Sequence, residues 1–292
     1  MGVEVFLKLE CHQTTGSFKL RGATHAILKL DQMARSKGVV TASTGNHGRA
    51  LAHAARALGV PVVVCMSDLV PDNKVKAIRQ MDAEVCITGH SQDDAQVEAL
   101  HLVHSRGLTF IPAFDHLDVI LGQATLGLEI IEQLPEVGTV VVPLSGGGLF
   151  SGVALGCKLV NPDVQAIGVS MEAGCAMHSS LQAGHPVDVE EVPTLADSLG
   201  GGIGLHNRHT FRLVQTLAHR TLLVNEDAIA QGIRHAYLEE REVLEGAGAV
   251  GISAVLSGQL PKPADGRPIV LLLSGRNIDM CLHQQLVCKA SL

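Results

Sequence analysis

The sequence predicts an α/β fold with parallel sheets, and three observations lead to this prediction. Short runs rich in β-branched residues alternate with longer helical stretches along the chain. The strand-like runs are apolar throughout rather than alternating, which is typical of strands buried on both faces. The intervening helices supply the crossovers that parallel strands need. No internal repeat or long linker interrupts this pattern.

Each element follows from its local composition. Strands are expected where β-branched and apolar residues run together between turn residues, at residues 4–9, 39–42, 62–65, 84–87, 109–111, 139–142, 165–169, 220–224 and 269–273. Helices are expected where apolar residues recur at helical spacing, at residues 46–58, 72–81, 92–105, 119–133, 149–160, 208–218, 227–240 and 247–256. Gly59 follows the first of these helices, as glycine often does at a helix C-terminus.

Composition excludes several classes of protein. Of the 292 residues, 46% are hydrophobic and 17% charged, which excludes a disordered chain. A net charge of −7 and only 2% aromatic residues argue against a nucleic-acid partner. No apolar stretch is long enough to span a bilayer and no signal peptide is evident, so no membrane partner and a cytoplasmic location are predicted. The seven cysteines are scattered without a CxxC pair. Reduced thiols and no metal site are therefore expected.

Two polar or glycine-rich turns between a strand and a helix indicate anion binding. In the turn at residues 41–48, backbone N–H groups at the helix start and the hydroxyls of Ser43 and Thr44 would suit a substrate carboxylate. Helix capping alone would account for one such residue, but less well for several in a row. The turn at residues 144–149 contains three consecutive glycines, whose amides can surround a phosphate. A third turn, at residues 273–277, is a weak signal by itself.

Lys19 is the candidate nucleophile. It falls near the first turn of an apolar-faced helix, within the segment 14–22. The positive end of the helix dipole and partial burial would both lower the pKa of such a lysine and favour a nucleophilic amine. A solvated side chain is the ordinary alternative. The flanking residues Ser17, Phe18 and Gly22 are not typical of an exposed helix.

Together these segments resemble the fold-type II pyridoxal-phosphate (PLP) enzymes, and within them the serine/threonine dehydratase and serine racemase family. The matching stretches occur in the family's order and cover nearly the whole chain, at residues 8–10, 15–23, 43–48, 145–149, 245–249 and 274–277. The resemblance implies the two-domain fold of tryptophan synthase β-like enzymes. A small domain at residues 38–115 is expected within a large PLP-binding domain formed by residues 1–37 and 116–292.

The resemblance also implies roles for individual residues. Lys19 would be the Schiff-base lysine, and Thr44 would stand where racemases carry a catalytic serine. The cofactor would be bound by Phe18, Lys19, Asn46, Ser145, Gly146, Gly147, Gly148, Leu149, Glu245 and Ser274. The substrate carboxylate would be held by Ser43, Thr44, Asn46 and His47. Ser274 would face the pyridine nitrogen, and Glu245 would have a supporting role.

The implied activity is β-elimination from a β-hydroxy amino acid such as threonine or serine, giving a 2-oxo acid and ammonia. PLP withdraws electrons from Cα of a bound amino acid, and Lys19 would take the Cα proton. Two alternatives are an amino-acid racemase on the same scaffold and a non-catalytic protein that binds an amino acid or PLP. The second alternative follows from the few dozen residues that relatives carry before the first strand and that this chain lacks. A homodimer is expected.

Two departures from the family pattern concern the substrate. Residues 200–202 are all glycine, and Arg276 stands where relatives carry glycine. A roomier site with an added cation would favour a longer or more polar β-hydroxy amino acid. These features also resemble the dehydratase branch of hydroxyectoine utilisation. The alternative is that the glycines form a tight turn and that Arg276 points to solvent.

Overall fold

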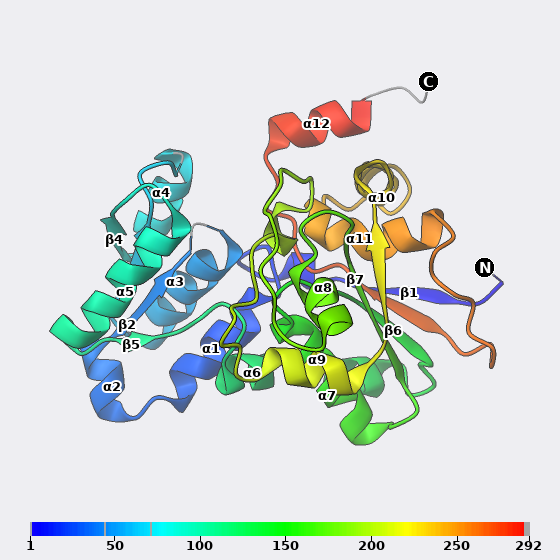
Figure 1. Cartoon of the computed structure of the whole chain (residues 1–292), viewed down its shortest axis with the longest axis horizontal. Coiled ribbons are helices and arrows are strands. Elements are labelled where there is room, and N and C mark those ends of the chain that lie inside the picture. The colour runs from blue at the N-terminus through cyan, green and yellow to red at the C-terminus, as the bar shows by residue number, and fades with distance from the viewer. Residues whose placement is uncertain (1, 44, 71, 289–292) are drawn as a thin grey trace. The chain divides into compact units, whose positions relative to one another are not determined.

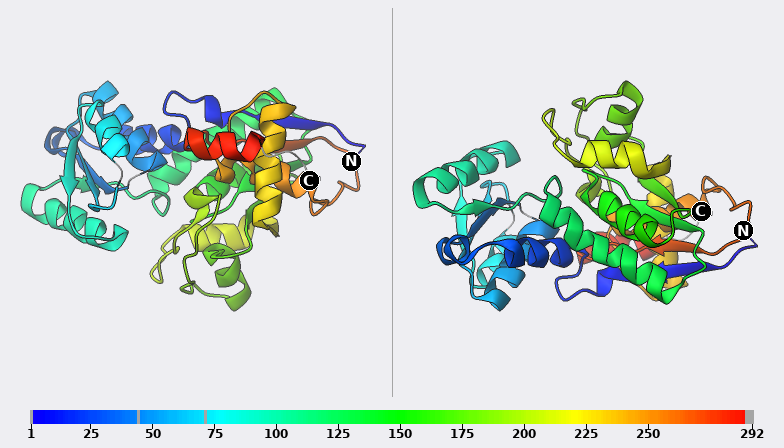
Figure 2. Two further views of the ribbon diagram at one scale, coloured as in Figure 1. Left: turned by 90° about the horizontal axis from the view of Figure 1, so that it is seen from above. Right: turned by 90° about the horizontal axis from the view of Figure 1, so that it is seen from below.

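The computed structural model describes residues 2–43, 45–70 and 72–288 and divides the chain into two compact units. The first unit consists of residues 1–18 and 123–292, and the second of residues 19–122. Each unit is built on one parallel sheet with helices on both faces (Figures 1 and 2). The α/β fold with parallel sheets predicted from the sequence is therefore confirmed.

The sheet of the first unit has the strand order β1-β9-β6-β7-β8. Its strands are β1 (Val5–Lys8), β6 (Thr139–Pro143), β7 (Gln165–Met171), β8 (Ala218–Val224) and β9 (Ile269–Leu272). In the centre, β6 and β9 pair in parallel, with Val141 opposite Leu271. Both strands are buried along their whole length, which explains their continuous apolar sequence. Their carboxyl ends, and the turns that follow, therefore lie next to each other.

Two cores cover the faces of this sheet. On one face pack α10 (Glu226–Leu238), α11 (Gly246–Leu256) and the 3₁₀ helix η2 (Asp197–Leu199). On the other pack α7 (Gly148–Val160), α8 (Ala176–Ala183), α9 (Thr210–Leu217) and the later part of α6 (Leu117–Gln133). Small residues allow close helix packing: a Cβ on Gly127 of α6 would come within 2.3 Å of a backbone oxygen of α7. The unit also holds the 3₁₀ helix η1 (Glu10–His12) and α12 (Met280–Cys288).

The sheet of the second unit has the strand order β4-β3-β2-β5. Its strands are β2 (Val39–Ala42), β3 (Val62–Met66), β4 (Glu84–Ile87) and β5 (Thr109–Phe110). One face is covered by α1 (Lys19–Lys29), α3 (Asn46–Leu58) and α4 (Asp72–Arg79), and the other by α5 (Gln92–Arg106). The short helix α2 (Gln32–Lys37) connects α1 to β2.

Some boundaries differ from the sequence predictions. Helices α2, α8 and α12 were not expected, because each is short and lacks a long apolar periodicity. A local signal for α2 was nevertheless present: the side chain of Asp31 caps it by accepting from the backbone N–H of Ala34 at 2.7 Å. The domain predicted at residues 38–115 falls inside the second unit and stays a prediction. That unit also includes α1, which packs on α3.

Candidate active site

The glycine-rich turn after β6 forms the first anion-binding candidate. Gly146, Gly147 and Gly148 are buried, and Gly147 is the N-cap of α7 with φ +87°. Only glycine adopts this backbone conformation without strain. Among the described residues, no side chain caps α7. The N–H groups of its first turn have no acceptor within the helix, so they can donate to an anion. The half-buried Ser145 begins the turn, and Leu149 is buried in the core beneath it.

The turn after β9 lies beside this loop, because β9 and β6 are neighbours in the sheet. Ser274 is only 3% exposed, and its carbonyl oxygen accepts from the backbone N–H of Phe18 at 3.0 Å. Ser17 and Gly275 form an antiparallel bridge. Phe18 packs against the core that contains the glycine loop. The structure thus brings Phe18, Ser274 and the loop after β6 together, although they are distant in the sequence.

Glu245 supports the turn after β9. It is buried, and its Oε2 accepts from the backbone N–H of Asn277 at 3.1 Å. A Cβ on Gly275 would lie 2.5 Å from Oε1 of Glu245, so the carboxylate and the turn are in close contact. Asn277 also donates from Nδ2 to the carbonyl oxygen of Thr15 at 2.9 Å. Asn277 belongs to the motif at residues 274–277, but no pattern in the sequence indicated its bond to Thr15.

In the second unit, Lys19 and His47 converge on one short segment. Lys19 is the first residue of α1, as its sequence context predicted, and its Nζ donates to the carbonyl oxygen of Ala113 at 2.8 Å. Nε2 of His47 lies 2.9 Å from the carbonyl oxygen of Ile111, to which it must donate. Ile111 is held by its own backbone N–H, which donates to the carbonyl oxygen of Val40 in β2. Residues 111 and 113 hold these side chains through backbone oxygens only, so residue types could not indicate this contact.

The environment of His47 keeps its imidazole neutral. Burial, followed by the positive charge of Lys19, lowers the pKa of His47 to about 3, against a smaller opposing effect of the bond to Ile111. With the proton on Nε2, the buried Nδ1 carries a lone pair and has no hydrogen-bond partner within the described part of the chain. Nδ1 is therefore an acceptor, and a carboxylate would find no donor at that atom.

The turn between β2 and α3 forms the second anion-binding candidate. Gly45 is the N-cap of α3, and Asn46 is its first residue. The described residues provide no side-chain cap for this helix. A Cβ on Gly48 would lie 2.5 Å from the carbonyl oxygen of Ser43, so glycine is needed for the tight turn. Thr44 lies outside the described residues, and its predicted role stays a prediction.

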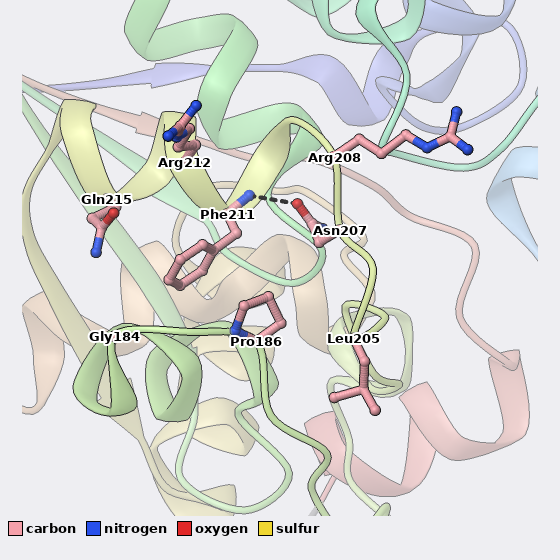
Figure 3. A pocket seen from close by; sticks show the side chains of 8 residues that line it. All are labelled: Gly184, Pro186, Leu205, Asn207, Arg208, Phe211, Arg212 and Gln215. Carbon is pink, nitrogen blue, oxygen red and sulfur yellow. Dashed lines mark hydrogen bonds between the residues drawn. The ribbon is translucent and has the colours of Figure 1, made fainter.

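A separate cavity of about 470 Å³ lies on the outer face of α9 (Figure 3). It is lined by Gly184, Pro186, Leu205, Asn207, Arg208, Phe211, Arg212 and Gln215, and none of the site residues predicted from the sequence is among them. Oδ1 of Asn207 accepts from the backbone N–H of Phe211 at 2.8 Å. The opposite face of α9 covers the glycine loop, since a Cβ on Gly147 would lie 2.9 Å from Val214.

Comparison with known proteins gives a consistent result. Residues 1–275 match the family described as pyridoxal-phosphate dependent enzyme. The chain is 57% identical to a putative threonine dehydratase of Sinorhizobium fredii, over 98% of this chain and 86% of that protein. Its fold is similar to the processed form of threonine deaminase isoform 2 from Solanum lycopersicum, with a TM-score of 0.91, 36% identity and coverage of 100% and 84%. It is also similar to maize serine racemase, with a TM-score of 0.91, 32% identity and coverage of 97% and 86%.

Proposed function

The chain belongs to the family of pyridoxal-phosphate dependent enzymes, and we propose that it eliminates water from a β-hydroxy amino acid such as threonine or serine. The products are a 2-oxo acid and ammonia. The observation that carries the proposal is the adjacency of two turns, the glycine loop at 145–148 and the Ser274 turn, at neighbouring strand ends. The similarity to a putative threonine dehydratase and to threonine deaminase supports this reaction over others on the same fold.

The residues of the first unit fit PLP. The uncapped start of α7 and the left-handed Gly147 offer amide donors where a phosphate dianion needs them. We assign the phosphate to Ser145, Gly146, Gly147, Gly148 and Leu149. Ser274 is a neutral partner for the ring nitrogen, with Phe18 fixed beside it through the backbone bond. Glu245 holds the turn that contains Ser274.

The residues of the second unit would act on the amino acid. PLP, when bound, supplies an electron sink for the Cα of the substrate. We assign Lys19 as the lysine that would hold the cofactor, and its amine would take the Cα proton. We assign the substrate carboxylate to the turn at residues 43–47, with Ser43, Thr44 and Asn46 as donors. His47, which presents an acceptor, keeps that turn in place through its bond to Ile111. Asn46 is also assigned to the cofactor ring.

Labelling tests the attachment of the cofactor. We expect purified protein to absorb in the visible range, and borohydride to fix the cofactor on the peptide that contains Lys19. The variant Lys19→Ala should retain the fold by circular dichroism and lose both the label and the release of 2-oxo acid. The matched control is Lys29→Ala, in the last turn of the same helix, which should keep both the label and the activity. Label on another lysine would contradict the assignment.

A racemase is the second candidate, because maize serine racemase is among the similar structures. Incubation with L-serine followed by chiral chromatography separates the two activities. We expect pyruvate to accumulate with little D-serine. Rapid formation of D-serine would favour the racemase, and neither product would favour a non-catalytic binding protein.

The finer substrate preference rests on the segment 195–202. The start of this segment lies next to the residue that follows Glu245, since a Cβ on Gly246 would meet the carbonyl oxygen of Leu195 at 2.1 Å. A Cβ on Gly202 would have the backbone nitrogen of Gly204 as its nearest neighbour, at 3.9 Å. Arg276 is exposed, as the alternative of a solvent-facing side chain also expects. We propose that the preferred substrate is a β-hydroxy amino acid longer or more polar than threonine, such as one derived from hydroxyectoine. The test is kcat/KM for L-threonine, 3-hydroxyaspartate and such an amino acid, in wild type and Arg276→Gly. If threonine is preferred by both proteins, the proposal is wrong.

A cytoplasmic location and a homodimer are also proposed. All seven cysteines are free and lie within the described residues, which suits a reducing compartment. Within the described residues, no helix combines the length and apolarity needed to cross a bilayer. Light scattering coupled to size-exclusion chromatography measures the mass in solution, and a mass twice that of the 30.7 kDa chain is expected.

A further inference from the structure

Three side chains with metal-binding atoms meet in the first unit, and none of the three is assigned to PLP. They are Cys11, His12 and Glu242, and their ligand atoms all lie within 4.8 Å of one another. Sγ of Cys11 is 3.9 Å from Oε2 of Glu242, and Nε2 of His12 is 2.7 Å from the same oxygen. No zinc site was expected from the sequence, because no closely spaced ligands occur in it. Glu242 is 230 positions away from His12.

The backbone holds both parts of this cluster in place. Cys11 and His12 lie in η1, and the N–H of Cys11 donates to the carbonyl oxygen of Leu273 at 2.8 Å. Glu242 follows the end of α10, and its N–H donates to the carbonyl oxygen of Ala236 at 2.8 Å. Arg241, which precedes Glu242, has φ +63°, a left-handed conformation that is costly for a residue other than glycine. Such strain is often retained at functional sites, and here it sets the position of Glu242.

An ion pair between His12 and Glu242 would explain why these two of the three side chains lie close together. The fully buried Cys11 thiol donates to the same carboxylate oxygen at 3.9 Å, which is long for a hydrogen bond, and it adds a third metal-binding atom to the pair. A thiolate, an imidazole and a carboxylate form a typical ligand set for Zn²⁺, at metal distances of about 2.0 to 2.3 Å. Two ligands on one tetrahedral ion are then about 3.2 to 3.6 Å apart. The two distances of this cluster lie on either side of that range, so small side-chain rotations would bring the atoms into position.

Burial and charge also suit a divalent cation. Cys11 is buried, the side chain of Glu242 is 17% exposed, and that of His12 is 51% exposed. An ion would therefore enter from the His12 side, where water can take a fourth position. One thiolate and one carboxylate balance the charge of a dication. Burial, followed by the charge of Glu242, raises the pKa of the Cys11 thiol, so a bound dication would have to supply the positive charge that a thiolate needs.

We propose that Cys11, His12 and Glu242 bind one divalent cation of the zinc type, with water as the fourth ligand. Binding forms the three metal–ligand bonds and releases the Cys11 thiol proton to solvent, without oxidation or reduction. The ion would tie η1 to the segment after α10. That segment continues to Glu245, which holds the Ser274 turn. The site is thus a structural link beside the turn assigned to the cofactor, and it stands independently of the proposed reaction.

Metal titration of the chelator-treated holoenzyme tests this proposal. We expect one Zn²⁺ per chain by mass spectrometry. Co²⁺ in its place should give a thiolate charge-transfer band in the near ultraviolet. Cys11→Ser should remove the band. His12→Gln and Glu242→Gln should each weaken binding at least about tenfold, as loss of a metal contact does. Cys281→Ser, which removes an exposed thiol, should bind like wild type.

Three results would overturn the proposal: no stoichiometric binding, a thiolate band that survives Cys11→Ser, or equal affinities in all variants. Because every variant carries the same cofactor, metal bound to PLP itself contributes equally and cancels in the comparison. Cys11 is buried, so the fold of Cys11→Ser is checked by circular dichroism before its metal binding is compared with wild type. His12 is exposed, and His12→Gln tests the site with the core unchanged.

Discussion

At the residue scale, His47 is the clearest case in which environment decides chemistry. Histidine ordinarily titrates near neutral pH, yet burial and the positive charge of Lys19 lower the pKa of this residue to about 3. The family resemblance implied that His47 helps to hold the substrate carboxylate. The bond from Nε2 to Ile111 leaves an acceptor at Nδ1 instead. The same residue therefore serves better to position the turn that carries Asn46.

This shift predicts how stability depends on pH. Between about pH 3 and pH 6.5 the unfolded chain binds a proton at His47 and the folded chain does not. Protonation therefore favours unfolding, and the stability present above pH 6.5 is lost as pH falls, by up to about 1.4 kcal/mol per pH unit. Urea unfolding of wild type and His47→Gln at pH 5 to 7.5 measures this. The variant should gain stability relative to wild type as pH falls.

Gln can still donate to Ile111 but does not titrate in this range. His101→Gln, which removes an exposed imidazole, provides the control. If the stability curves of wild type and His47→Gln stay parallel across this range, the imidazole is not held neutral by the fold.

At the element scale, the start of α7 provides the proposed phosphate site. Gly147 is needed there for two reasons: its φ of +87° and the closeness of Met177, 2.8 Å from where a Cβ would stand. The consecutive glycines predicted this turn from the sequence, because a run of three exceeds what a tight turn requires. What the sequence could not predict is that α9 covers the loop from outside.

Gly147→Ala should therefore weaken PLP binding and destabilise the fold. The left-handed conformation alone costs about 1 to 2 kcal/mol for a residue with a Cβ. Gly258→Ala is the matched control, with φ +72° and nothing within 4 Å of its Cβ. Gly147→Ala should show the larger loss in urea unfolding, because its Cβ also meets Met177, and only Gly147→Ala should raise the Kd for PLP in an absorbance titration. An unchanged Kd would remove the loop from the cofactor site.

At the scale of the whole molecule, cofactor binding should stabilise the folded chain. A ligand that binds only the folded state adds about 2.7 kcal/mol when its free concentration is 100 times Kd. For a chain of this size that corresponds to a rise in Tm of several degrees. Calorimetry of apoprotein and reconstituted protein measures the shift, and Lys19→Ala should show a smaller one. Equal melting temperatures for the two forms would argue against specific binding of PLP.

The sequence by itself determined what depends on local physics. The alternation of apolar runs and helical stretches predicted parallel α/β sheets, confirmed by the strand pairings. The placement of Lys19 at a helix start followed from its flanking residues. Short helices such as α2 and α12 were missed, because a few turns give too little periodicity to recognise.

Only the tertiary structure decided which distant residues meet. Strand order places β9 beside β6, and this order brings the Ser274 turn next to the glycine loop. Backbone oxygens at 111 and 113 hold His47 and Lys19, and a carbonyl carries no signature in the sequence. Cys11 and Glu242 come together in the same way, across 231 positions. Contacts over such separations depend on how the sheet is ordered and packed, which no local pattern of residues encodes.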